Sequence, residues 1–235
     1  MGKYFGDFQI DFFDCLDSTN SYLLQNGTKD KQVVVAKKQN KGRGRNDRTW
    51  ISDDGNLYFS IFLKVNLNEN IAQISYIAAC ACLLSLKQIN EKLDISLKWP
   101  NDLLVKGKKI AGILLESDNI KNAVICGIGV NNKNNPQSLQ YPTTCLEKQQ
   151  ITIENEDLLK IILENFDKLY TLWQNFGFKT IRQLWMKNCQ NLNKKVTIGK
   201  KSGVFVDINE DGDLILKVNN ENLAINCGEI DQSKN

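Results

Sequence analysis

A run of β-branched residues leads directly into a segment dense in glycine and arginine, and this junction constrains the fold more than any other feature. Residues 32–38 read Gln-Val-Val-Val-Ala-Lys-Lys, which is typical of a strand. Residues 41–50 follow as Lys-Gly-Arg-Gly-Arg-Asn-Asp-Arg-Thr-Trp. Glycine permits close backbone approaches, arginine supplies a planar fork of charged donors, and tryptophan offers a flat stacking face. We therefore expect a loop that closes over an anionic, ring-bearing small molecule, with a nucleotide as the first interpretation.

The glycine–arginine segment matches neither of the common phosphate-binding loops. It lacks the Gly-Lys-Ser/Thr ending of a P-loop, and its glycines are too close together for the dinucleotide fingerprint. Taken alone, such a segment is also compatible with a solvated turn, which is the less favoured interpretation. The chain carries 30 Lys and Arg against 27 Asp and Glu, a net charge of +3, which is too mild for general nucleic-acid binding. The basic run is therefore a local feature of a site.

The chain contains no histidine, which excludes Ser-His and Cys-His nucleophilic catalysis. Its seven cysteines form no C-x-x-C pair, so a zinc site is disfavoured. We expect reduced, mostly buried thiols in a cytoplasmic or organelle-interior protein, with the cytoplasm as the expected location. No stretch approaches the roughly 20 apolar residues of a membrane span. Chemistry must therefore rest on Arg, Lys, Asp, Asn and a bound metal.

The first 190 residues mix strand and helix signals. A polar residue within 18–20 is expected to cap a short helix, and further helices are predicted over 71–92, 154–176 and 178–188. Strands are predicted over 32–38, 57–65, 95–99, 109–116 and 122–130. Short strands then dominate, near 195–198, 203–208, 213–218 and 223–226. We therefore place a boundary near residue 190, before a small β module.

Two further segments carry residues suited to chemistry. In the first, Lys98-Trp99-Pro100-Asn101-Asp102 is followed by a strand that begins at Lys109, and Gly112 inside that strand indicates a close approach by a ligand or another backbone. Lys109 alone could be a surface lysine and Asp102 a turn residue. In the second, the strand end Gly127-Ile128-Gly129-Val130-Asn131 leaves space beside an amide. Neither segment decides a function by itself.

Five motifs occur together in one order: Ser18-Thr19-Asn20, Gln39 to Trp50, Lys98 to Asp102, Lys109 to Leu114, and Gly127 to Asn131. Over about residues 10–132 this arrangement resembles the biotin–protein ligases, and the end of the chain resembles the small C-terminal β-barrel of that family. The resemblance implies an α+β fold: a mixed or antiparallel sheet packed with helices, of the class II synthetase-like type, plus that barrel. The biotin- and ATP-binding catalytic domain would span 1–190, and the barrel 191–235.

The resemblance also implies a reaction in two steps. Biotin is activated by ATP as biotinyl-5′-AMP with release of pyrophosphate, and a lysine of a biotin-acceptor (carboxyl carrier) domain of a biotin-dependent carboxylase then takes the acyl group. ATP and Mg²⁺ would act as co-substrate, biotin as substrate, and no tightly bound cofactor is expected. Both steps depend mainly on positioning and charge stabilisation, for which a site without histidine is adequate.

Site residues follow from the motif positions. The resemblance assigns biotin binding to Ser18, Thr19, Asn20, Gln39, Arg43, Gly44, Arg45, Lys109 and Gly112. It assigns nucleotide contacts to Arg43, Arg45, Arg48, Trp50, Lys109 and Asn131. It assigns catalytic roles to Lys109, Arg45, Asp102 and Lys98. Lys109 would lie between the biotin carboxylate and the α-phosphate, Trp50 would stack near adenine, and Asp102 is our candidate to orient or deprotonate the incoming amine. No residue of the chain is assigned to Mg²⁺.

Several alternatives remain at this point. Some family members carry an N-terminal helix-turn-helix and repress transcription; because the Ser-Thr-Asn motif begins at residue 18, we expect a monofunctional ligase with no specific DNA binding. Because no apolar stretch is long enough for a membrane span, we expect no membrane contact. A homodimer stays open. The nearest rival is a lipoate or octanoate ligase, which shares fold and acyl-adenylate chemistry. A non-catalytic regulator and a plain ligand-binding α/β domain are the rivals from other classes.

Overall fold

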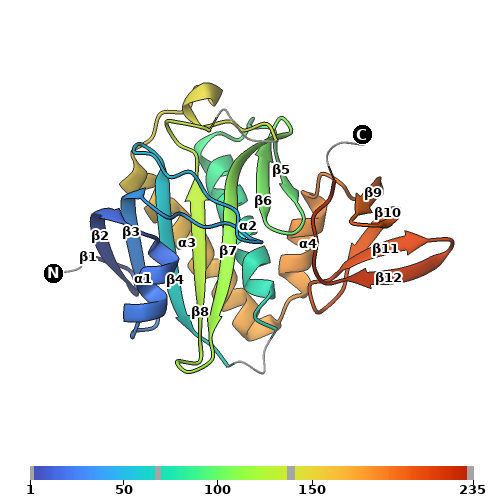
Figure 1. Cartoon of the computed structure of the whole chain (residues 1–235), viewed down its shortest axis with the longest axis horizontal. Helices are drawn as coiled ribbons and strands as arrows, with labels where there is room; N and C mark the ends of the chain where they lie inside the picture. Colours follow the sequence, from blue (N-terminus) through green and yellow to red (C-terminus); the bar gives the residue numbers. More distant parts are fainter. Residues whose placement is uncertain (1–2, 67–69, 137–140, 232–235) are drawn as a thin grey trace.

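The computed structural model describes residues 3–66, 70–136 and 141–231. Its main body is an eight-stranded sheet in the order β1-β2-β3-β4-β8-β7-β6-β5 (Figure 1). The strands are β1 Lys3–Phe5, β2 Phe8–Leu16, β3 Gln32–Gln39, β4 Leu57–Lys64, β5 Ile95–Lys98, β6 Asp102–Val105, β7 Lys108–Asp118 and β8 Ala123–Val130. The β2–β3 pair is parallel and the other neighbouring pairs are antiparallel, which confirms the expected mixed sheet. The outer ends of the two expected domains, 1–2 and 232–235, lie outside the described residues.

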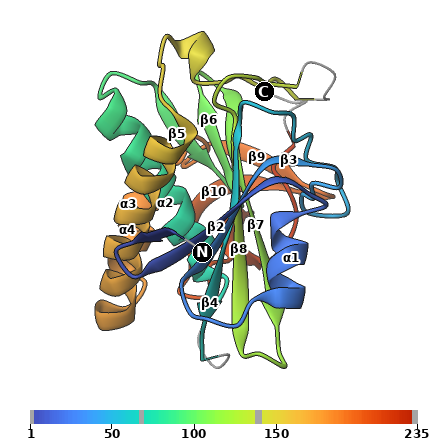
Figure 2. The same ribbon diagram turned by 90° about the vertical axis from the view of Figure 1, so that its left-hand side faces the viewer.

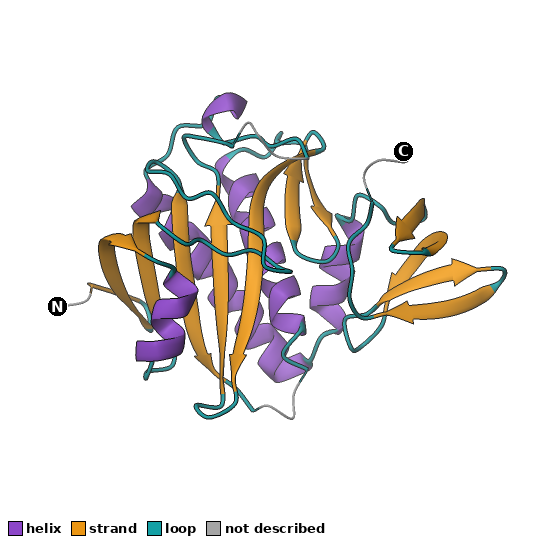
Figure 3. Ribbon diagram, viewed as in Figure 1, coloured by secondary structure: helices purple, strands orange, loops and turns teal. Residues whose placement is uncertain are grey.

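Helices cover the two faces of the sheet unequally. α2 (Gln73–Ile89), α3 (Asn155–Phe176) and α4 (Lys179–Lys187) pack on one face, and α1 (Thr19–Asn26) packs on the other (Figure 2). The larger hydrophobic core lies under the three helices. A smaller cluster lies under α1 and consists of Leu23, Val34, Phe62, Ala123 and Ile125. Because α1 is short, part of its face of the sheet is left for loops. The loop between β3 and β4 crosses this face, in teal in Figure 3.

The C-terminal module is a separate antiparallel sheet in the order β12-β11-β10-β9, drawn in orange to red in Figure 1. Its strands are β9 Lys195–Ile198, β10 Lys201–Ile208, β11 Leu214–Val218 and β12 Glu221–Ile225. An isolated bridge joins Ile198 to Ile230. The expected small β module behind the helices is thereby confirmed.

The tip of the β10–β11 hairpin contacts helix α2 of the main body. Tyr76 on α2 donates its hydroxyl proton to the carbonyl oxygen of Gly212 at 2.5 Å and accepts from Trp99 Nε1 at 3.1 Å. Trp99 and Tyr76 are both buried. A buried polar relay therefore links the module to the segment that holds Lys98 and Asp102.

Three strands were not among those expected from the sequence. β1 and β2 form the edge of the sheet, where Phe12 is exposed and the apolar alternation is interrupted. β6 has only four residues and lies between the turn that follows Pro100 and the turn at Lys106 and Gly107. Because turn-forming residues flank it on both sides, a strand of four residues is too short to show a recognisable alternation of apolar and polar residues. Among the described residues, no helix is long and apolar enough to cross a membrane.

Candidate active site

A pocket opens on the α1 face of the sheet, between the glycine–arginine loop, the first turn of α1 and the β5–β6 connection. Its walls come from separate parts of the chain, including the C-terminal module through Glu229. The predicted site residues that line it are Ser18, Thr19, Asn20, Gln39, Arg43, Gly44, Arg45, Arg48, Trp50, Lys98, Asp102, Lys109 and Gly112. Every predicted site residue except Asn131 is therefore brought to one place, although their roles remain predictions.

The floor beside α1 is built from hydroxyl and amide groups. Ser18 is the N-cap of α1, and its hydroxyl accepts from the backbone N–H of Ser21 at 3.4 Å, as the cap pattern predicted. The backbone N–H of Thr19 donates to Gln39 Oε1 at 2.8 Å. Gln39 Nε2 in turn donates to Ser52 Oγ at 2.9 Å. These bonds fix the Ser18 hydroxyl, the backbone at Thr19 and the orientation of the Gln39 amide.

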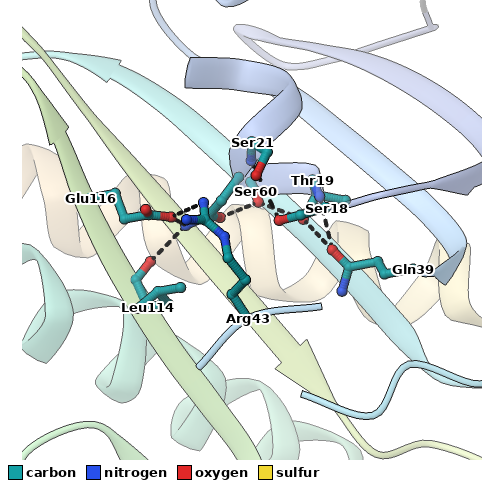
Figure 4. Close-up of polar contacts among 9 residues, drawn as sticks. Ser18, Thr19, Ser21, Gln39, Arg43, Ser60, Leu114 and Glu116 are labelled. Atoms are coloured by element: carbon teal, nitrogen blue, oxygen red, sulfur yellow. Dashed lines mark hydrogen bonds and ion pairs between the residues drawn. The ribbon is translucent and has the colours of Figure 1, made fainter. Parts of the chain in front are cut away.

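Ser60 of β4 extends this polar floor beneath α1 (Figure 4). Its Oγ is fully buried and lies 2.7 Å from Thr19 Oγ1 and 2.5 Å from Asn20 Oδ1. Asn20 Nδ2 donates to Glu116 Oε2 at 2.8 Å, and Arg43 Nη2 lies 2.7 Å from the same oxygen. The floor is thus tied to the glycine–arginine loop through one carboxylate.

The glycine–arginine loop folds as a short hairpin. Gly44 donates its N–H to the Arg48 carbonyl at 2.7 Å, and Trp50 donates to the Gly42 carbonyl at 2.9 Å. Arg48 Nη1 forms an ion pair with Glu229 Oε2 at 2.7 Å. The loop is therefore held by its own ladder and by the C-terminal module, and it is not a free solvated turn.

The ring of Trp50 lies on two glycines that face each other across β7 and β8. Gly112 and Gly129 are register partners. A Cβ added to Gly112 would stand 2.9 Å from Trp50 Cζ3, and one added to Gly129 would stand 2.7 Å from Trp50 Nε1. The close approach expected at Gly112 is confirmed, and the approaching group is this ring. Among the described residues, no partner accepts from the buried Nε1 of Trp50.

Positive charge gathers around Asp102. Lys109 Nζ lies 2.6 Å from Asp102 Oδ1, and the two side chains are 13% and 21% exposed, so Lys109 is not a surface lysine. The same Nζ lies 5.1 Å from the centre of the Trp50 ring and 5.3 Å from that of Tyr141. Burial lowers the pKa of Lys98, although Asp102 and Glu229 counteract part of this effect. A cationic centre in a partly dehydrated pocket suits an anionic ligand.

Asn131 is the one predicted residue that the structure does not bring into the central pocket. It is buried, and its Nδ2 donates to the carbonyl of Thr144 at 3.0 Å. It lines a small neighbouring cavity that shares Trp50, Lys109 and Tyr141 with the pocket. Its contact with a nucleotide therefore stays a prediction.

The residues of the pocket or its hydrogen-bond network that were not predicted as site residues include Ser60, Glu116, Tyr141 and Glu229. Ser60 is a small polar residue flanked by the apolar residues Phe59 and Ile61 of β4, and this contrast could have identified it. The other three reach the site only through tertiary structure. Tyr141, for example, is carried there by pairing between Lys109 and Thr143.

The seven cysteines take no part in this site. All are free, and four of them are buried. Burial raises the pKa of Cys82 to about 12, so its thiol stays protonated and unreactive. Within residues 3–66, 70–136 and 141–231, no group of three or more Cys, Asp or Glu side chains could hold a metal ion.

Comparisons with known proteins agree with this geometry. The Biotin/lipoate A/B protein ligase family matches residues 12–131. The bifunctional ligase/repressor BirA of Bacillus subtilis is 30% identical over 225 residues, covering 88% of this chain and 69% of that protein. The biotin–[acetyl-CoA-carboxylase] ligase of Paracoccus denitrificans is 30% identical over 218 residues, covering 86% of this chain and 91% of that protein.

Solved structures show the same likeness. The biotin protein ligase of Aquifex aeolicus in complex with biotin and ATP superposes with a TM-score of 0.85 at 27% identity, covering 94% of this chain and 97% of that one. A likeness of this extent includes both the main sheet and the C-terminal module. The chain therefore belongs to the biotin/lipoate A/B protein ligase family, as a relative of its biotin–protein ligases.

Proposed function

We propose that this chain is an ATP-dependent biotin–protein ligase, which forms biotinyl-5′-AMP and transfers biotin to a lysine of a biotin-acceptor domain. The observation that carries the proposal is the convergence of thirteen predicted residues on one pocket. The names of the relatives and the biotin and ATP complex of the Aquifex aeolicus protein support it.

In the first step, a carboxylate oxygen of biotin attacks the α-phosphorus of ATP, and the bond between the α-phosphorus and the bridging oxygen breaks to release pyrophosphate. Two anions must approach each other in this step, so the site has to offset negative charge. Lys109 stands within the pocket at the centre of the cationic cluster and is proposed to bridge the two reacting groups. Arg43, Arg45 and Arg48 line the loop side and are proposed to hold phosphate and acyl-phosphate oxygens.

In the second step, the amine of the acceptor lysine attacks the acyl carbon, the bond to the phosphate oxygen breaks, and AMP leaves. The amine must lose a proton to become a nucleophile. Asp102, 2.6 Å from Lys109 and near Lys98, is proposed to orient the amine or take that proton.

The roles of the aromatic residue and of the floor follow from their positions. Trp50 is proposed to stack near the adenine ring, because it lines the pocket and its buried Nε1 has no partner among the described residues. Ser18, Thr19 and Gln39 are proposed to bind the polar head group of biotin. Asn131, outside the central pocket, is proposed to reach the nucleotide through the neighbouring cavity.

Magnesium is proposed to enter with ATP. The pocket carboxylates Asp102 and Glu229 already face Lys109 and Arg48, so the chain offers no dedicated cage. An ion that keeps its waters and binds mainly through phosphates fits such a donor set. The acceptor is proposed to be the carrier domain of a biotin-dependent carboxylase, the compartment the cytoplasm, and a homodimer remains compatible with the chain. The catalytic domain is proposed to end near residue 190.

The test is a transfer assay with purified protein, ATP, biotin and a biotin-acceptor domain. We expect a mass increase of one biotinyl group on a single acceptor lysine, and pyrophosphate release that depends on biotin. Parallel reactions with lipoate and octanoate measure the alternative. Activity with lipoate and none with biotin would overturn the proposal.

A further inference from the structure

Glu116 on β7 joins the two halves of the pocket without belonging to any of the five motif roles. Its Oε2 accepts from Asn20 Nδ2 at 2.8 Å and forms the ion pair with Arg43 Nη2 at 2.7 Å. Its side chain is 23% exposed. Arg43 lines the central pocket, whereas Glu116 does not and lines, together with Arg43, a second hollow along the loop; Figure 4 shows its carboxylate beside the Arg43 guanidinium. Glu116 is therefore placed to support pocket residues rather than to contact a ligand.

The carboxylate decides which way the Asn20 amide points. An ionised carboxylate can only accept, so the Asn20 NH₂ group must face Glu116. The backbone carbonyl of Leu114, 3.3 Å from the same Nδ2, favours the same orientation. Asn20 Oδ1 then faces Ser60 at 2.5 Å, and Ser60 must donate its single hydroxyl hydrogen to it.

Ser60 connects Asn20 to the rest of the pocket floor. Its Oγ lies 2.7 Å from Thr19 Oγ1. The Thr19 hydroxyl donates to Gln39 Oε1 at 3.1 Å, and the Thr19 backbone N–H donates to the same oxygen at 2.8 Å. Glu116, Asn20, Ser60, Thr19 and Gln39 therefore form one connected polar network, in which a shift of Asn20 is passed on to residues that line the pocket.

We propose that Glu116 is a positioning residue, which orients the Asn20 amide beside the pocket floor and holds the side chain of Arg43 in place through an ion pair. The proposal rests on the proposed function for its reaction. The two contacts require different properties of the side chain at position 116. Asn20 needs a hydrogen-bond acceptor, whereas Arg43 needs a negative charge.

Two substitutions separate the contacts. Glu116→Gln keeps an oxygen that can accept from Asn20 but removes the charge that faces Arg43. We expect a biotin KM within about twofold of the parent and a kcat for biotin-dependent pyrophosphate release about tenfold lower, a loss the size of one charge-assisted hydrogen bond. Glu116→Ala removes both contacts, and we expect the biotin KM also to rise about tenfold.

A third substitution disturbs Asn20 from the opposite side. A Cβ on Gly127 would stand 2.1 Å from Asn20 Oδ1. Gly127→Ala should therefore raise the biotin KM as Glu116→Ala does, and leave kcat closer to the parent because Arg43 keeps its partner. Asp118→Asn is the matched control: it lies on the same strand and face as Glu116, but its Oδ1 accepts from the backbone of Ile120 and Lys121. We expect its KM and kcat within about twofold of the parent.

The outcomes separate the inference from the proposed function. A parent protein that releases no pyrophosphate with biotin, lipoate or octanoate overturns the function. An active parent, together with Glu116 variants whose KM and kcat match it, overturns the inference. Equal losses in Glu116→Gln and Glu116→Ala with a lowered Tm would also overturn it, since they indicate a structural role only.

Discussion

Substitution of a single pocket residue can affect the reaction and the stability of the fold to different extents, and Lys109 is an example. Lys109 and Asp102 form a close pair with low exposure, and Lys98 lies near the same carboxylate. Removing Lys109 leaves Asp102 with a second cation nearby, so the fold loses little. The reaction, in contrast, loses the charge nearest to where two anions must meet. A substitution of Lys109 should therefore lower activity strongly and change the stability of the fold only slightly.

Lys109→Gln is expected to lower biotin-dependent pyrophosphate release by about 10²–10³-fold, as the loss of one preorganised charge at a transition state does. Thermal unfolding should change by only a few degrees. Pyrophosphate release near the parental rate in this variant would contradict the role proposed for Lys109. Lys108→Gln, at the exposed neighbour, is the control and should keep full activity.

Lys98 provides a test in pH. Its folded-state pKa is lowered from 10.5 mainly by burial, so between the two pKa values the unfolded chain binds more protons than the folded chain. Stability therefore rises with pH across that window. Lys98→Met lacks this contribution, and the parent should gain stability relative to the variant as pH increases. Urea unfolding of both proteins at about pH 7, 9 and 10 measures the difference. A difference in unfolding free energy between the two proteins that stays constant with pH would contradict this expectation.

Among the elements, α3 shows how one helix divides its residues between core and solvent. Phe166 is buried and stacks on Tyr170 with ring centres 5.7 Å apart, whereas Phe176 at the end of the same helix is 74% exposed. The apolar residues recur at helical spacing, and acidic residues occupy the first turn. This pattern explains why the helix was predictable to within a residue at each end.

Phe166→Ala should destabilise the protein by about 3–5 kcal/mol, because it removes a large buried side chain and leaves a cavity. Phe176→Ala carries the same chemical change at an exposed position and should stay within about 0.5 kcal/mol of the parent. Urea denaturation measures both. Similar losses in the two variants would show that α3 does not pack as described.

Burial also explains which strands were predicted from the sequence and which were missed. β3, β4 and β8 are buried over most of their length and consist largely of apolar residues, so their sequences alone identify them. β2 lies near the sheet edge, and β6 takes its strand geometry from pairing with β5 and β7. Information that sits in a partner strand cannot be read from the segment itself.

Across the whole molecule, the site combines motifs that local chemistry marks with residues that only the fold delivers. The Ser-Thr-Asn cap and the glycine at 112 have local reasons for their identity, and both were predicted. Glu229 enters from the C-terminal module and Tyr141 from a loop that pairs beside Lys109. No spacing in the sequence indicates such meetings. The module is held to the main body by polar contacts as well as by the shared core.

Arg182 of α4 is one such contact. Its guanidinium donates to the Ile208 carbonyl and to both carboxylate oxygens of Asp207. Arg182→Ala should cost about 1–3 kcal/mol and speed hydrogen exchange in β10 more than in β4. Lys179→Ala, at an exposed position of the same helix, is the control. Uniform exchange rates across β4 and β10 in Arg182→Ala would contradict a separable attachment.

The hydrogen bonds from Trp99 through Tyr76 to Gly212 make the pocket's ability to bind biotin depend on the folded C-terminal module. Until the β10–β11 turn is in place, the Tyr76 hydroxyl lacks the Gly212 carbonyl as its acceptor, and the segment that carries Lys98 lacks a contact worth about 0.5–1.5 kcal/mol. A chain still emerging from the ribosome, or one cut before Gly212, should hold this segment poorly and capture biotin weakly. Biotin binding by chains truncated at residue 190 and at residue 231 would measure that delay. The protein would then become active only after the C-terminal module has been synthesised and has folded.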